Sequence, residues 1–383
     1  MKLSKSCLTA RRYTKLLLLA VALCLTLFDA NLSRTTQGQP QERAAEQVYR
    51  NIQVFKGLTS SQLLGAMNFM AGSLGVSCNH CHVPNQFAKD DKPAKHTARQ
   101  HIQLMRSIND MNFGGQVVTT CVTCHRGETR PTATLAIPLT ARTDRAPASR
   151  TALSLPTVDE VIERYLQAVG GRKRFEQLKS LKLTGTRETR NGADAPSIDR
   201  LEVYREAPNR LFMSFENSAG SSSQAFDGTI GWRQFNGRVA AITGADLLGA
   251  KRDADFYKDI HIKEQYANLT VVGKVRLAER EVFVIEATFP ETHPAKSMFG
   301  VVSEKLYFDT QSGLLVRRAM EYRTPLGILP EATDYAEYRK VGGLMFPFTI
   351  RLSRPPLVVT QRLVNIDLNA SINAGLFEMP AAK

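Results

Sequence analysis

The sequence predicts two folded parts of different class: a small all-α unit, and a C-terminal α+β unit in which a curved antiparallel, half-barrel-like sheet packs on a helix. Apolar residues recur at helical spacing between residues 59 and 112, whereas apolar and polar residues alternate from residue 181 onward. Between them, four prolines and many small residues are typical of a linker. The predicted divisions are 1–30, 43–127, 128–156 (the linker) and 157–383.

The first 30 residues have the layout of an export signal or a weak membrane anchor. A basic segment precedes a run of apolar or small residues, Leu16 to Phe28, which is shorter than the ~20 residues that span a bilayer. The mature protein is therefore expected in the periplasm, with this segment either cleaved or kept as an anchor. Cys24 leaves lipid modification open, although the large Leu23 before it argues against a lipoprotein site.

The charge of the chain argues against nucleic acid as a partner. The formal net charge is +14, but the basic residues are scattered, and no recognisable nucleic-acid-binding motif follows the basic start. Such a protein favours acidic partners or anionic lipid headgroups. The C-terminal part contains no nucleophile triad, phosphate loop or metal-binding cluster by sequence, so its residues do not indicate an enzyme.

Two Cys-x-x-Cys-His motifs carry the chemistry of the chain. Cys78 and Cys81 precede His82, and Cys121 and Cys124 precede His125. Disulfides would suit an exported protein but give no reason for a histidine after each pair. A zinc ribbon needs its two cysteine pairs closer together than these are. Covalent haem c accounts for every residue, because two thiols bind one haem and the adjacent histidine ligates its iron. We therefore expect two covalent haems.

The segment before the first motif predicts a helix that supplies the sixth iron ligand. Residues 59–74 begin with residues that can cap a helix and place Met67 and Met70 on one apolar face. A methionine stripe is commonly core filler. The eleven residues from Met67 to Cys78 nevertheless allow a helix, a turn and a return under the ring, so Met67 is preferred as the ligand over Met70.

A parallel helix is predicted before the second motif. Residues 93–112 begin with Pro93 near the first helical position and place His101 and Met105 one turn apart on one face. A histidine on an apolar helical face is usually a satisfied core or surface group, but a neighbouring haem motif favours ligation. Either side chain could reach the second iron.

The stretches "MNFMAGSLGVSCNHCH", "FAKDDKPAKHTARQHIQLMRSIND" and "VTTCVTCHRG" resemble the two-haem repeat of the cytochrome c subunit of photosynthetic reaction centres, over about residues 51–131. The resemblance implies that Met67 ligates the first iron. It sets His101 where the family more often has methionine, which implies a bis-histidine second haem with Met105 as second choice. The family subunit is often tetrahaem, whereas this chain carries a single pair.

The expected ligands predict an electron carrier in photosynthetic or respiratory electron transfer. Two protein ligands on each iron leave no position for a substrate, so the haems change oxidation state without activating a molecule. Methionine ligation predicts a higher potential for the first haem than for the second, where electrons would enter. The expected partners are redox proteins or a membrane electron-transfer complex. The alternative is a redox enzyme or module of peroxidase or dehydrogenase type, with one iron that opens.

The C-terminal unit is expected to begin with an amphipathic helix at residues 157–171 and a short helical piece, followed by at least eight strands. Turn signals such as Asp227-Gly228, Asn236-Gly237, Ser312-Gly313 and Gly342-Gly343 indicate consecutive hairpins. This layout weakly resembles the half-barrel of periplasmic lipoprotein carriers. The resemblance implies either an acyl chain or lipid bound in the concavity, or a scaffolding or docking role.

Overall fold

The computed structural model of the chain describes residues 42–131, 155–291 and 303–381. The predicted export signal at residues 1–30 and most of the predicted linker lie outside the described residues. None of the helices within the described ranges is both long and apolar enough to cross a membrane. We call residues 43–131 the helical part and residues 155–381 the sheet part.

The helical part is built on two long helices, and both confirm the sequence prediction to within a residue. A capping box between Thr59 and Gln62 starts α3, and the left-handed Gly75 ends it. Pro93 occupies the first turn of α4, which ends at the left-handed Gly114. The elements in order are α2 (Ala45–Val48), α3 (Ser60–Leu74), the 3-10 turn η1 (Cys78–His80), α4 (Pro93–Phe113) and α5 (Cys121–His125).

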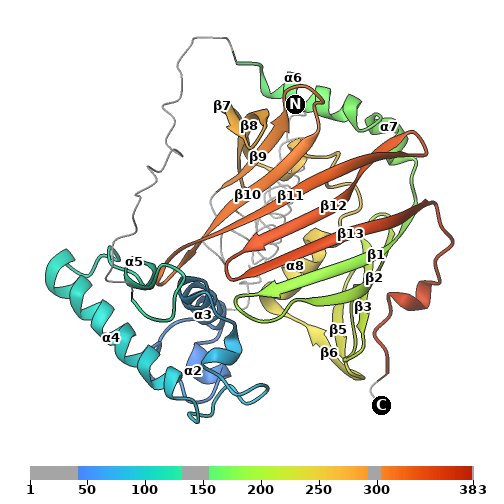
Figure 1. The fold of residues 1–383 in the computed structure, drawn as a ribbon. Coiled ribbons are helices and arrows are strands. Elements are labelled where there is room, and N and C mark those ends of the chain that lie inside the picture. The colour runs from blue at the N-terminus through green and yellow to red at the C-terminus, as the bar shows by residue number, and fades with distance from the viewer. Residues whose placement is uncertain (1–41, 132–154, 292–302, 382–383) are drawn as a thin grey trace, which may run out of the picture. The chain divides into compact units, whose positions relative to one another are not determined.

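The sheet part starts with α6 (Val158–Ala168) and α7 (Arg172–Glu176) and continues into one antiparallel sheet of 13 strands (Figure 1). The sheet is curved but unclosed, because β6 forms one edge and β7 the other. The strands are β1 (Ser180–Asn191), β2 (Ser197–Glu206), β3 (Arg210–Asn217), β4 (Gly220–Phe226), β5 (Gly231–Phe235), β6 (Arg238–Ile242), β7 (Asn268–Leu277), β8 (Arg280–Thr288), β9 (Ser303–Asp309), β10 (Leu315–Thr324), β11 (Gly327–Val341), β12 (Leu344–Arg354) and β13 (Leu357–Leu368).

The connections follow the predicted turns. All four turn signals lie between strands that pair with each other, including Asp227-Gly228 between β4 and β5 and Gly342-Gly343 between β11 and β12. Among the strands of the described residues, β1 and β13 are the only sheet neighbours that are not consecutive in sequence, and they join the two runs of hairpins. Strand β6, α8 (Gly244–Ala254), η2 (Lys263–Gln265) and η3 (Ala374–Leu376) were not among the predicted elements.

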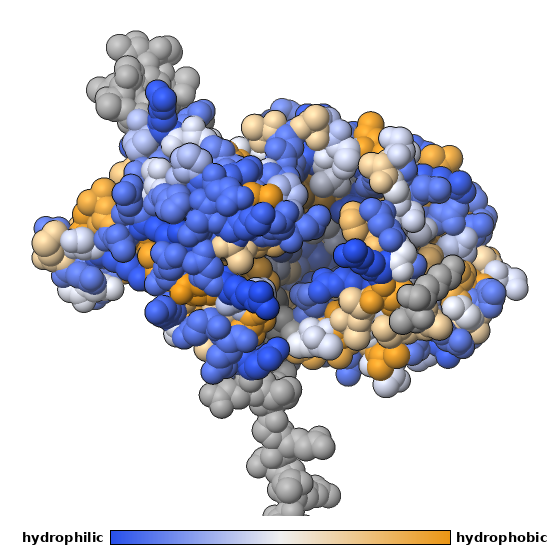
Figure 2. Space-filling model, turned by 90° about the horizontal axis from the view of Figure 1, so that it is seen from below, coloured by the Kyte–Doolittle hydropathy of each residue, from blue (hydrophilic) through white to orange (hydrophobic). Residues whose placement is uncertain are grey.

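Two apolar clusters fill one face of the sheet and confirm that it packs on helices. Ile162 and Tyr165 of α6 pack with buried strand residues such as Phe308. The second cluster joins Ala254 at the end of α8 to Leu201, among other strand residues. Figure 2 shows a mainly hydrophilic face of the molecule, with hydrophobic side chains in separate patches.

A third apolar cluster forms the core of the helical part and includes the tip of the β10–β11 hairpin. Phe55, Leu63 and Phe69 of the helical part are buried there together with Leu326 and Leu329 of the hairpin. Fully buried apolar side chains of this size each contribute about 1.5–3 kcal/mol. The sheet part therefore completes the core of the helical part, although the sequence predicts a linker between the two.

Candidate functional site

The first motif presents a histidine that is prepared for metal ligation. His82 follows η1, and its Nδ1 lies 2.9 Å from the carbonyl oxygen of Phe87. Because a carbonyl can only accept, the ring proton lies on Nδ1, and Nε2 keeps the lone pair that binds a metal. Burial lowers the pKa of His82, which favours the neutral ring that ligation requires.

The loop that supplies this carbonyl is fixed to α4. The ammonium of Lys95 donates to the carbonyls of Phe87 and Lys89 at 2.9 and 2.7 Å. Asp90 accepts two hydrogen bonds from Arg99, at 2.9 and 3.0 Å, and pairs with Lys95 at 2.9 Å. The Arg99 guanidinium, followed by Lys95, holds the pKa of the Asp90 carboxyl well below its usual range. The orientation of the first histidine therefore depends on the helix that serves the second site.

A buried asparagine of α4 holds the chain that enters the second motif. Asn109 is 3% exposed, and its amide nitrogen donates to the carbonyl of Thr119 at 2.8 Å. Its amide oxygen accepts from the backbone N–H groups of Thr119 and Val118, at 2.8 and 3.2 Å. Helix α5, which contains the whole Cys-x-x-Cys-His sequence, begins directly afterwards. These three bonds fix the position of the motif relative to α4.

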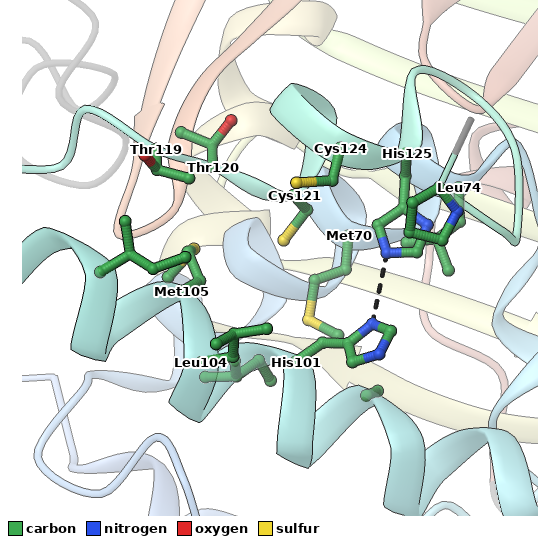
Figure 3. A pocket seen from close by; sticks show the side chains of 14 residues that line it. Met70, Leu74, His101, Leu104, Met105, Thr119, Thr120, Cys121, Cys124 and His125 are labelled. Carbon is green, nitrogen blue, oxygen red and sulfur yellow. Dashed lines mark hydrogen bonds between the residues drawn. The ribbon is translucent and has the colours of Figure 1, made fainter. Parts of the chain in front are cut away.

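The second histidine faces the predicted partner. His125 is 5% exposed, and its Nδ1 lies 3.0 Å from the carbonyl oxygen of Glu128, which leaves the lone pair on Nε2. That Nε2 lies 3.3 Å from Nδ1 of His101, which reaches across from α4 (Figure 3). The structure thus brings together the two histidines that the sequence pairs as axial ligands.

His101 and His125 line a cavity of about 140 Å³. Cys121 and Cys124 line it on the side of α5, and Met105 lines it from α4 beside His101. Met105 is 8% exposed and also belongs to the core of the helical part, so its position fits both core packing and its role as second-choice ligand. The other lining residues are mostly apolar: Met70, Leu74, Ala98, Ile102, Leu104, Ile108, Thr119, Thr120 and Pro131.

The donor set fits a haem better than the rival groups. The cysteines in the described ranges, Cys78, Cys81, Cys121 and Cys124, are all free thiols in this structure. In the same ranges, no three His, Cys, Asp or Glu side chains gather into a group that could hold a metal ion by themselves. A haem instead needs two thiols, one or two axial side chains and an apolar surround, and the second site provides each of these.

Helix α3 contributes to both sites, which the sequence analysis missed. Met67 lies partly buried against the core of the helical part, and its ligation of the first iron stays a prediction. Met70, considered for the first iron, lines the 140 Å³ cavity at the second motif together with Leu74. The N–H of Gly127, after the second motif, donates to the carbonyl of Ser73 at 2.8 Å and ties the two motifs together.

A second cavity, of about 90 Å³, lies beside the first motif. Its lining on the helical side includes Cys78 and two residues of α3, Asn68 and Ala71. The remaining lining comes from the sheet part, at the end of β1 and the turn between β12 and β13: Asn191, Arg354, Pro355, Pro356 and Leu357. No sequence pattern joins these residues to Cys78, so only the fold reveals them.

Comparison with known proteins identifies the relatives of the helical part. Residues 27–160 match the family described as photosynthetic reaction centre cytochrome C subunit. The chain is 39% identical over 82 residues to cytochrome c-554 of Chloroflexus aurantiacus, which covers 20% of each protein. It is 37% identical over 93 residues to the photosynthetic reaction center cytochrome c subunit of Thermochromatium tepidum, covering 23% of this chain and 22% of that subunit. The matches therefore span about a fifth of each relative.

The sheet part has neighbours among solved structures. A LolA superfamily protein from Nitrosomonas europaea matches with a TM-score of 0.41 and 13% identity, covering 58% of this chain and 98% of that one. Since the identity and the TM-score are both low, the match says nothing about what the sheet binds.

Proposed function

We propose that this chain, whose helical part resembles reaction-centre cytochrome c subunits, is a dihaem c-type cytochrome that carries electrons in the periplasm. One observation carries the proposal: His101 and the motif histidine His125 lie 3.3 Å apart and line one mainly apolar cavity together with both motif cysteines. When bound, haem c supplies the one-electron redox chemistry. The residues of the chain supply its attachment, its axial ligands and its surroundings.

The proposed ligands of the second haem are His125 and His101, with covalent attachment to Cys121 and Cys124. Each nitrogen of the facing pair comes from a different helix, and the anchored Nδ1 of His125 keeps its ring from turning. Apolar side chains on the remaining walls exclude water, which disfavours the extra charge of the ferric state and so helps to set the potential. Met105 is the second choice as ligand.

The proposed ligands of the first haem are His82 and Met67, with attachment to Cys78 and Cys81. The anchored Nδ1 of His82 parallels that of the second motif histidine. A thioether ligand stabilises the ferrous state, so the first haem should have the higher potential and receive electrons from the second. Redox proteins or a membrane electron-transfer complex are the proposed partners, and the N-terminal segment is the proposed export signal or anchor.

Carbon monoxide binding to the reduced protein tests this function and its ligands. The wild type should show no spectral change, because both irons already hold two protein ligands. The variants His101→Leu and Met67→Leu should each open one iron to carbon monoxide. Met105→Leu is the matched control for His101 on α4, and Met70→Leu is the matched control for Met67 on α3. Each control removes a sulfur near the tested residue and should leave both irons closed to carbon monoxide.

Other outcomes would redirect the proposal. Carbon monoxide binding by the wild type would favour the alternative, a redox enzyme or module with an openable iron. Opening by Met105→Leu instead of His101→Leu would move the second ligand to the thioether and remove the bis-histidine assignment. Equal midpoint potentials for the two haems in a redox titration would contradict the proposed direction of electron flow.

A further inference from the structure

We propose that the turn between β12 and β13 forms one wall of the first haem site, and that the ion pair of Arg354 with Glu331 sets the potential of that haem. The inference rests on the proposed function, because it needs a haem bonded to Cys78 and Cys81. It concerns residues of the sheet part, outside the Cys-x-x-Cys-His motifs and their predicted ligands.

The helical part and this turn are in direct backbone contact. A Cβ at Gly72 of α3 would lie 2.9 Å from the carbonyl oxygen of Pro355, so only glycine permits this approach. Gly192, just after β1, has a positive φ of 59°, and a Cβ there would lie 2.7 Å from the carbonyl carbon of Val76. The chain segment leading into the first motif is therefore packed against the sheet at two points.

The cavity beside Cys78 lies at the same contact. Asn68 and Ala71 of α3 line it on one side, and Arg354 and Pro355 are among the residues that line it on the other. Any group bonded to the thiol of Cys78 consequently has the β12–β13 turn as a neighbour. The sheet part thereby belongs to the surroundings of the first haem, whereas the lining of the 140 Å³ cavity at the second motif includes no residue of the sheet part.

The charged group at this wall is held by an acidic partner. Nη1 of Arg354 lies 3.3 Å from Oε2 of Glu331 on β11, and the hydroxyl of Tyr322 donates to Oε1 of Glu331 at 3.0 Å. The Glu331 side chain is only 11% exposed and that of Arg354 is 34% exposed. Water therefore screens this pair less than a surface pair, so a change in either charge extends further into the protein.

The sign of the effect on the haem follows from charge. Reduction adds an electron, which a neighbouring cation favours and a neighbouring anion opposes. Arg354→Gln leaves the Glu331 carboxylate without its cation, so the potential of the first haem should fall. Glu331→Gln leaves the guanidinium without its anion, so the same potential should rise. A role in packing alone would not reverse sign between the two variants.

Potentiometric titration of the full chain tests the proposal, with a pyridine haemochrome count on every sample. The variants are Arg354→Gln, Glu331→Gln and the charge-conserving Arg354→Lys, which should stay near the wild-type value. Arg233→Gln is the control, because Arg233 of β5 pairs with Asp246 of α8 at 3.4 Å and neither residue lines either cavity. His101→Met assigns the two waves, since it changes a ligand of the second haem only.

The expected result is opposite shifts in the wave that His101→Met leaves unmoved, with no shift in the control. Two haems with unmoved potentials, shifts of one sign, or equal shifts in both waves would overturn this inference while leaving the proposed function intact. A wild type without covalent haem would overturn both. If Arg354→Gln fails to fold, Glu331→Gln still decides, because its potential must rise.

Discussion

Replacing Leu326 with alanine tests whether the β10–β11 hairpin belongs to the core of the helical part. Leu326 is 1% exposed and packs in the cluster that contains Phe55, Leu63 and Phe69. The substitution removes three carbon groups, worth about 0.8 kcal/mol each in transfer from water, or roughly 2.4 kcal/mol. The cavity left behind brings the expected loss of unfolding free energy to about 3–5 kcal/mol.

The assay is urea unfolding followed by the haem spectrum, which reports the helical part, and by far-ultraviolet circular dichroism, which reports the sheet. Leu326→Ala should lower the midpoint of the haem signal. Ile328→Ala, two residues away and 55% exposed, should change the stability by no more than about 0.5 kcal/mol. An unchanged haem transition in Leu326→Ala, with a loss seen only in the sheet signal, would refute the shared core.

Three further predictions follow from single contacts. Asn109→Ala strips the partners from the backbone groups of Thr119 and should cost about 2–3 kcal/mol in urea unfolding, whereas a neutral result would mean that water replaces them. The pKa of Asp90 is lowered mainly by Arg99, so this carboxylate contributes stability that is fully present above about pH 4 and is lost as the pH falls toward the folded-state pKa. Asp90→Asn should therefore make the unfolding free energy depend less on pH in the acid range. Gly72→Ala should lower the thermal stability by about 1–3 kcal/mol, because its methyl group meets the Pro355 carbonyl; full stability would show that α3 can move away from the turn.

Local patterns account for most of the fold. The alternation of apolar and polar residues, with Gly-containing turns between them, predicted the hairpins that contain β1 to β5 and β7 to β13. Strand β6 was signalled only by the Asn236-Gly237 turn before it, because its five residues, RVAAI, are too few and too small to show a clear alternation. Helix α8 escaped because its apolar residues do not form a clear stripe, whereas α6 shows one.

The sequence could propose the residues of the second site because two of them share one face of a periodic helix and the others form a specific motif. His101 and Met105 share a face of α4, and the spacing of Cys121 to His125 is chemically specific. The contacts of the first site with the sheet were not predictable. Pro355 meets α3 through the fold alone, far along the chain from the first motif, and no local pattern encodes such a contact.

The number of covalent haems per chain, measured by pyridine haemochrome absorbance together with the intact mass of the purified protein, decides whether both motifs bind haem. We expect two haems in the wild type and one in the double variant Cys121→Ser, Cys124→Ser. A wild type without covalent haem would contradict the proposed function, because the four cysteines and both facing histidines would then need another role.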